Sequence, residues 1–160
     1  MKTLSGEVRR LAKAGATLAV AESCTGGMLS VAITALPGVS TVFMGGVVCY
    51  ANSVKERVLG VPRKTLESHG AVSTETATAM AEGVCRILQA EAGVAITGIA
   101  GPGGAVPGKP VGTVYIAAHY ANHTTVRRFH FRGTRAQVRR SAAIAAATLL
   151  RKSIKVAQVF

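Results

Sequence analysis

The sequence predicts an α/β fold, namely a three-layer α/β/α domain with a mixed central sheet of about five strands. Helix-like and strand-like segments alternate in the first part of the chain, which favours parallel strands joined by covering helices. Two strand-like segments then follow one another directly, which predicts an antiparallel pair. The chain has 160 residues, 49% hydrophobic and 16% charged, and can bury a large core. We therefore expect a single domain over residues 1–160.

Hydrophobic periodicity places alternating helices and strands in the first half. We expect a helix over 4–14, a strand over 17–21, a helix over 26–36, a strand over 43–50 and a helix over 52–59. Gly15 and the pair Pro37-Gly38 end the first two helices. Gly45-Gly46 predicts a bulge or a close backbone approach inside the second strand. Asn52 is expected to cap the helix that it begins.

The second half contains the remaining strands and the two longest helices. We expect a helix with Pro62 in its first turn, a helix from Ser73 or Thr74 to Ala92, strands over 94–97, 111–120 and 124–131, and a last helix over about 134–156. The hydroxyls and early glutamate of Ser73-Thr74-Glu75 are typical of a capped helix start. Residues 121–123 predict a hairpin turn. The Gly/Pro-rich segment 98–110 is the one long irregular loop expected, and such loops often carry function.

The positive charge of the chain favours attraction of anions but does not by itself indicate nucleic acid. The formal net charge is +12, and residues 122–160 hold many basic residues but no acidic one. Nucleic-acid-binding proteins usually add stacking aromatics or a recognised module to such a patch. Only Phe129 and Phe131 lie nearby, and no such module is present. We therefore expect no nucleic acid as partner.

The types of residue present exclude several classes of site. All seven acidic residues are glutamates, which excludes a Ser-His-Asp triad, an aspartyl dyad and an EF-hand loop. The three cysteines form no C-x-x-C pair, so we expect neither a disulfide framework nor a cysteine-based zinc site. The charged N-terminus lacks a signal-peptide core, and no apolar run reaches the roughly 18 residues of a membrane span. We expect a cytoplasmic protein without a membrane partner, and the apolar helices suggest a homo-oligomer.

The glycine-rich loop TGIAGPGGAVPGKPVG (97–112) fits neither of the common nucleotide-binding motifs. Pro110 stands where a P-loop has the Ser or Thr that holds magnesium, and a strand follows instead of a helix. Val106 stands at the last glycine position of a dinucleotide fingerprint that would begin at Gly101 and Gly103. A lid, a nest of backbone N–H groups for an anion, and a plain surface loop stay open.

Several polar side chains should meet at one edge of the sheet. The carboxyl ends of parallel strands lie at the same edge, so the turns after Ala21, Tyr50 and Thr97 should lie close together. With the glycine loop they would surround one pocket, whose other members are Glu22, Ser23, Thr25, Asn52 and Lys55.

The stretch AESCTGG (21–27) can be read in two ways. Its hydroxyls can cap a helix that begins at Gly26, or Ser23 can be a nucleophile presented on a strand-to-helix turn. A nucleophile needs a base, and Lys55 becomes one if burial lowers its pKa, although it can equally be an exposed helix lysine. Arg135 and Arg139 are four residues apart and share one helix face, where two guanidiniums can grip a phosphate or carboxylate.

Six linked motifs resemble those of the CinA C-terminal domain family, the nicotinamide mononucleotide deamidases. They are AESCTGG (21–27), the Y-x-N-x-x-K string at 50–55, HGAVS (69–73), TGIAGPGG (97–104), KPVGTVY (109–115) and the Arg-rich start of the last helix. They occur in the family's order and cover nearly the whole chain.

The resemblance implies an α/β/α fold and hydrolysis of nicotinamide mononucleotide to nicotinate mononucleotide and ammonia, without metal or other cofactor. Ser23 would be the nucleophile and Lys55 its base, with Tyr50, Asn52 and Thr97 orienting the base or the carboxamide. The glycine loop, including Gly98, Gly101 and Gly103, would meet the ribose phosphate together with Arg135. Amide groups beside Gly26 and Gly27 would stabilise the oxyanion.

The chain departs from the family pattern at two positions, and two alternatives stay open. Thr134 stands where the family commonly has aspartate, in Gly-Asp-Arg, and Ala105 stands where glycine is usual. Cys24 could be the nucleophile instead of Ser23, because a thiol at a helix N-terminus can have a lowered pKa. The domain could also be a nucleotide-binding, regulatory or nucleic-acid-contacting module without turnover.

Overall fold

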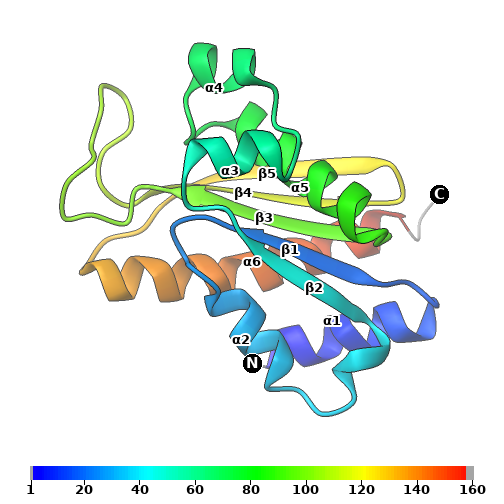
Figure 1. Cartoon of the computed structure of the whole chain (residues 1–160). Coiled ribbons are helices and arrows are strands. Elements are labelled where there is room, and N and C mark those ends of the chain that lie inside the picture. Colours follow the sequence, from blue (N-terminus) through cyan, green and yellow to red (C-terminus); the bar gives the residue numbers. More distant parts are fainter. Residues whose placement is uncertain (1, 158–160) are drawn as a thin grey trace.

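One five-stranded sheet forms the centre of the protein, whose computed structural model describes residues 2–157 (Figure 1). Its strands are β1 (Leu18–Glu22), β2 (Phe43–Val48), β3 (Ala92–Gly98), β4 (Thr113–Tyr120) and β5 (His123–His130), in the order β2-β1-β3-β4-β5. Strand β1 pairs in parallel with both β2 and β3, whereas β4 is antiparallel to both β3 and β5. The predicted mixed sheet of five strands is therefore confirmed.

Helices cover both faces of the sheet, as the three-layer prediction requires (Figure 1). One layer contains α1 (Lys2–Lys13), α2 (Met28–Thr34) and the long α6 (Arg135–Ala157); the other contains α3 (Asn52–Arg57), α4 (Arg63–His69) and α5 (Thr74–Leu88). A short 3₁₀ helix, η1 (Val39–Thr41), leads into β2. No helix among residues 2–157 is both long enough and apolar enough to cross a membrane.

The two faces of the sheet are packed with side chains of different size. Toward α1, α2 and α6 the central strands present branched residues such as Leu18, Val20 and Ile96. Toward α5 they present mostly alanine, at Ala19, Ala21, Ala95 and Ala117. Because a face of alanines leaves little depth, α5 can lie close to the sheet and its own larger side chains fill the layer.

Two glycines allow close packing around α5: Gly83 on α5 faces the segment that follows α3, and Gly93 on β3 faces α5. A Cβ atom at Gly83 would lie 2.1 Å from the carbonyl oxygen of Leu59, and one at Gly93 would lie 2.4 Å from Sγ of Cys85. Both distances are far below van der Waals contact, so neither position has room for a side chain.

The glycine pair in β2 behaves as predicted. Leu18 pairs with Phe43 but Ala19 pairs with Gly45, so Met44 is the extra residue of a bulge. A Cβ at Gly46 would lie 2.4 Å from Oγ of Ser30, which confirms a close approach, here to the side chain of a helix residue.

Other turn and cap predictions have mixed outcomes. Ser73 caps α5 as expected, since its Oγ accepts from the amide of Thr76 at 3.1 Å. Ala121 and Asn122 have positive φ and form the predicted hairpin turn. The prediction for Asn52 is wrong: Ala51 occupies the N-cap position of α3, and no side chain caps it. Helix α5 ends at Leu88, earlier than predicted, because Gln89 turns left-handed and Ala92 already pairs in β3.

Candidate active site

A cavity of about 210 Å³ opens where the parallel strands β1 and β3 end. The residues that line it are Ser23, Cys24, Tyr50, Asn52, Lys55, Ala71, Val72, Thr97, Gly98, Ala100 and Arg135. They come from the turns after β1 and β2, from α3, from the loop before α5, from the end of β3 and the residues after it, and from the start of α6. The predicted convergence at the carboxyl edge thus occurs in the structure.

Ser23 and Lys55 form the polar centre of this cavity. Ser23 directly follows β1, and its amide donates to the carbonyl of Ile96 at 2.9 Å, which fixes its backbone to β3. Lys55 lies on α3, is only 1% exposed, and places Nζ 3.2 Å from Oγ of Ser23. The reading of Lys55 as an exposed helix lysine is therefore wrong.

The surroundings of Lys55 favour its neutral form. Nζ lies 2.9 Å from the carbonyl oxygen of Cys49 and 3.2 Å from that of Tyr50. Both carbonyls belong to the segment between β2 and α3, the helix that carries Lys55. No ion pair found among residues 2–157 includes Lys55. Burial lowers the pKa of this amine below its usual 10.5, because water no longer solvates the charge.

Glu22 serves the turn after β1 and not the cavity. Its buried carboxylate accepts from the amides of Gly27 at 3.1 Å, Leu29 at 3.0 Å and Ser30 at 2.8 Å, and from the Ser30 hydroxyl at 2.7 Å. The carboxylate therefore caps α2, whose N-cap residue, Gly27, has no side chain. Glu22 does not line the cavity.

This arrangement corrects two expectations from the sequence. Helix α2 is not capped by Ser23, Cys24 or Thr25. Its N-cap residue makes no side-chain hydrogen bond, and the carboxylate of Glu22 accepts from the first amides of the helix instead. The amides of Gly26 and Gly27 are not free for an oxyanion either: that of Gly26 donates to the Ser23 carbonyl at 3.1 Å and that of Gly27 to Glu22.

Arg135 and Arg139 diverge instead of gripping one anion. Arg135 lines the cavity, donating to the Gly101 carbonyl at 2.7 Å and to the Tyr50 hydroxyl at 2.9 Å. Arg139 donates from Nε to the Cys24 carbonyl at 3.1 Å and from Nη2 to the Thr25 carbonyl at 2.8 Å. It is absent from the cavity lining, so the two-arginine grip predicted from their spacing is wrong for this structure.

The other predicted pocket residues divide into lining and supporting positions. Asn52, Thr97 and Gly98 line the cavity, and Oγ1 of Thr97 donates to the Ala71 carbonyl at 2.7 Å. The lining does not include Thr25, Gly26, Gly27, Gly101 or Gly103.

Sequence reasoning missed the small residues Ala71, Val72 and Ala100 in the lining. Ala71 and Val72 belong to the HGAVS motif, one of the six that carry the family resemblance. Their apolar side chains have no catalytic chemistry, so the sequence did not identify them as lining residues.

Thr134 replaces one function of an aspartate at the start of α6. Its Oγ1 accepts from the Gln137 amide at 3.4 Å, and its own amide donates to Oε1 of Gln137 at 2.7 Å. This reciprocal pair is a capping box. The start of α6 is therefore held in place without aspartate at this position.

The thiol of Cys24 is unsuited to act as a nucleophile. Cys24 is buried beside Ser23, and burial raises the pKa of its thiol to about 11. The guanidiniums of Arg135 and Arg139 act in the opposite direction but do not offset the burial. A thiol with this pKa holds little thiolate near neutral pH.

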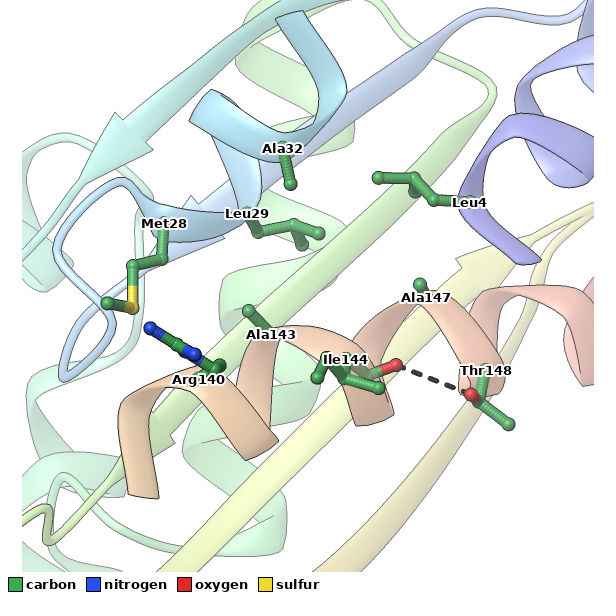
Figure 2. Close-up of a pocket in the computed structure, with 9 residues that line it drawn as sticks. All are labelled: Leu4, Met28, Leu29, Ala32, Arg140, Ala143, Ile144, Ala147 and Thr148. Carbon is green, nitrogen blue, oxygen red and sulfur yellow. Dashed lines mark hydrogen bonds between the residues drawn. The ribbon is translucent and has the colours of Figure 1, made fainter. Parts of the chain in front are cut away.

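A second cavity lies apart from this site, between α1, α2 and α6. It measures about 220 Å³ and is mostly apolar, with Leu4, Leu29 and Ile144 among its lining and Arg140 at the Met28 end (Figure 2). None of the residues predicted for the site lines it.

Comparison with known proteins agrees with the resemblance seen in the motifs. The family model described as CinA C-terminal domain matches residues 2–154. The chain is 50% identical over 148 residues to a CinA-like protein of Thermotoga neapolitana and 52% identical over 148 residues to one of Anaeromyxobacter sp. (strain K). In each case the match covers 92% of this chain but only 36% of the relative, so the chain spans about a third of the length of these relatives.

Solved structures share the fold over almost their full length. The competence damage-inducible protein A of Klebsiella pneumoniae is 35% identical with a TM-score of 0.90, covering 95% of each chain. A competence-damaged protein (CinA) superfamily protein of Enterobacter cloacae is 39% identical with a TM-score of 0.89, covering 93% of this chain and 89% of that one. The chain therefore belongs to the CinA C-terminal domain family.

Proposed function

We propose that this protein is an amidohydrolase that converts nicotinamide mononucleotide to nicotinate mononucleotide and ammonia, with Ser23 as nucleophile and Lys55 as its base. The observation that carries the proposal is the 3.2 Å separation of Oγ of Ser23 and Nζ of Lys55 inside a cavity. Membership of the CinA C-terminal domain family and the six linked motifs support the choice of substrate.

The contacts of Lys55 suit a neutral amine that accepts a proton. A neutral amine has two N–H groups, which can donate to the carbonyls of Cys49 and Tyr50, and one lone pair, which is left for the hydroxyl of Ser23. The lowered pKa of Lys55 makes this form accessible at a lower pH than for a solvated lysine. Lys55 is therefore placed as general base, and its two carbonyl partners fix the direction of the lone pair.

The reaction then proceeds in two halves with all protons accounted for. Lys55 takes the Ser23 proton while Oγ attacks the carboxamide carbon, and the resulting ammonium returns that proton to the departing nitrogen, which leaves as ammonia. The acyl group is now on Oγ of Ser23. Lys55 next takes a proton from water, whose oxygen attacks the ester carbon, and then returns that proton to Oγ of Ser23 as the nicotinate product leaves.

The mouth of the cavity suits the phosphate of a mononucleotide. Arg135 lines the cavity and is exposed, and its guanidinium spans from the Gly101 carbonyl to the Tyr50 hydroxyl. A phosphate oxygen is a stronger acceptor for guanidinium than either of these neutral groups. Among the described residues that line the cavity none is acidic, so an anionic substrate meets no carboxylate there.

The direct test is product analysis with purified protein and nicotinamide mononucleotide. We expect ammonia and nicotinate mononucleotide in equal amounts, loss of both in Ser23→Ala, and retention in Cys24→Ala. Loss in Cys24→Ala with retention in Ser23→Ala would overturn the serine assignment. The same assay with chelator should give an unchanged rate, because the proposed steps use only Ser23 and Lys55.

Absence of turnover combined with salt-dependent DNA binding would instead support a non-catalytic module. The buried Ser23–Lys55 pair favours the enzyme, because burying an amine without a carboxylate partner is costly for a module that needs no base.

A further inference from the structure

Two consecutive amide groups directly after Ser23 have no acceptor in the part of the chain that the structure describes. Among the hydrogen bonds found in residues 2–157, neither the N–H of Cys24 nor that of Thr25 is a donor. By contrast, the neighbouring amides of Ser23, Gly26 and Gly27 are all bonded, to Ile96, Ser23 and Glu22. Of the two residues, Cys24 lines the cavity, and an unbonded amide next to the nucleophile is the kind of donor that an oxyanion requires.

The peptide planes that carry these two amides are held from their carbonyl side. The Ser23–Cys24 peptide is fixed by the bond from the Gly26 amide to the Ser23 carbonyl, at 3.1 Å. The Cys24–Thr25 peptide is fixed by Nε of Arg139, 3.1 Å from the Cys24 carbonyl. In a trans peptide the N–H points opposite to the C=O. The N–H of Thr25 therefore points away from Arg139.

Arg139 acts from behind the turn and not from inside the cavity. The cavity lining includes Ser23 and Cys24 but neither Thr25 nor Arg139, whose guanidinium is occupied by the Cys24 and Thr25 carbonyls. A Cβ atom at Gly26, which has φ +58°, would lie 3.3 Å from Nη2 of Arg139, so this glycine leaves space for the guanidinium. By holding both carbonyls, Arg139 fixes the backbone that directly follows the Cys24 amide.

We propose that the N–H of Cys24 is a donor of the oxyanion-binding site of this enzyme, and that Arg139 is the positioning residue that holds the turn carrying this amide through the Cys24 and Thr25 carbonyls. The inference rests on the proposed function, since the oxyanion arises when Ser23 attacks a carboxamide. The assignment differs from the sequence analysis in two respects. The amides at Gly26 and Gly27 are not the oxyanion donors, and Arg139 supports the turn instead of binding the phosphate.

The test compares Arg139→Met and Arg139→Lys with Arg140→Met. Methionine keeps the length of the side chain but donates to neither carbonyl, whereas lysine keeps the charge and can still reach one of them. Arg140 is the next residue on α6, is exposed, and takes part in no hydrogen bond or ion pair found among residues 2–157, so its variant is the matched control. Circular dichroism and thermal melting show which variants are folded.

We expect Arg139→Met to lower kcat by roughly 10- to 100-fold with KM changed less than about twofold, because the oxyanion exists only in the transition state and intermediate. Arg139→Lys should recover part of that loss, and Arg140→Met should match the wild type. A rise in KM with kcat unchanged in Arg139→Met would instead make Arg139 a substrate-binding residue and overturn the inference.

A second measurement does not depend on turnover. Pyridine-3-boronic acid can bond to a serine hydroxyl as a negatively charged tetrahedral boronate, with an oxygen where the oxyanion forms, whereas nicotinamide binds with a neutral carboxamide at that place. We expect Arg139→Lys to weaken boronate binding by about tenfold and nicotinamide binding by less than twofold. Equal effects on both ligands would overturn the positioning role even if Arg139→Met fails to fold.

The two proposals fail in different ways. Wild-type protein that neither releases ammonia from nicotinamide mononucleotide nor binds the boronate overturns the proposed function and this inference together. Wild-type turnover with Arg139→Met indistinguishable from Arg140→Met overturns the inference alone.

Discussion

Nζ of Lys55 lies 3.2 Å from Oγ of Ser23, although 32 residues separate them in the chain. The contact depends on two parallel strands, since β1 ends at Glu22 and β2 leads into α3, the helix that carries Lys55. Removing either side chain should therefore stop the reaction without disturbing the sheet that brings them together.

Lys55→Met should abolish ammonia release, with a fall in kcat of about 10³-fold or more, since Ser23 would lose its base. In the wild type, kcat/KM should rise with pH through the lowered pKa of Lys55, because only the neutral amine accepts the proton. The measurement is a pH–rate profile from pH 6 to about 10. A flat profile, or activity retained in Lys55→Met, would exclude Lys55 as base.

Stability should also depend on pH through Lys55. Between its lowered pKa in the folded chain and the ordinary 10.5 in the unfolded chain, the unfolded chain binds more protons, so the free energy of unfolding should rise with pH in that window. Lys55→Met has no amine at this position, so its free energy of unfolding should lack this rise with pH. Urea titrations of both proteins at several pH values measure the difference, and parallel pH dependences would contradict a buried amine with a lowered pKa.

Glu22→Gln should destabilise the fold by roughly 2–4 kcal/mol. The carboxylate accepts hydrogen bonds from three backbone amides and a hydroxyl, whereas the NH₂ group of glutamine is itself a donor and would lie against some of these donors. The matched control is Glu67→Gln, since Glu67 lies in an exposed pair with Arg63. Its effect should stay within about 0.5 kcal/mol. Chemical denaturation compares the two, and similar values would show that Glu22 contributes little to the turn.

Gly83→Ala should cost about 2–3 kcal/mol, since the new methyl group would lie 2.1 Å from the Leu59 carbonyl and α5 would have to move. Gly103→Ala is the control, because a Cβ there meets nothing within 4 Å. It should leave stability within about 0.5 kcal/mol of the wild type. Thermal melts of the pair test whether close packing of α5, and not glycine as such, matters.

Arg135→Met should raise KM for nicotinamide mononucleotide by about 10- to 100-fold with a smaller effect on kcat, if the guanidinium binds the phosphate. Arg132→Met is a suitable control, because Arg132 is exposed and has no side-chain hydrogen bond among residues 2–157. With nicotinamide riboside, which lacks the phosphate, the two variants and the wild type should react alike. A persisting difference with the riboside would place Arg135 at the reacting group instead.

Much of this architecture could be predicted because it depends on local pattern. The strands and helices follow from hydrophobic period, and the meeting of Ser23, Lys55 and Thr97 follows from the rule that parallel strands end at one edge. The position of a residue that directly follows a strand is fixed by the sheet, so its neighbours could be inferred from topology alone.

The direction of side chains could not be predicted in the same way. Glu22 and Ser23 are adjacent, yet one side chain caps α2 and the other lines the cavity. Side chains alternate along a strand, and Ser23, which directly follows β1 and still bonds to Ile96 of β3, faces the side opposite to Glu22. Arg135 and Arg139 share a helix face, but only the first reaches the cavity, since the turn after β1 lies beside the second and offers two carbonyls. Such choices depend on which backbone groups lie near, which only the assembled structure determines.

The alanine face beneath α5 has a consequence for how this family can vary in sequence. Where strand positions such as Ala19, Ala95 and Ala117 have no spare depth, a larger residue on the strand can be accepted only if a partner on the helix becomes smaller at the same time. Substitutions in this layer should therefore occur as compensating pairs across the interface, whereas the opposite face, with its branched side chains, can exchange volumes among several neighbours.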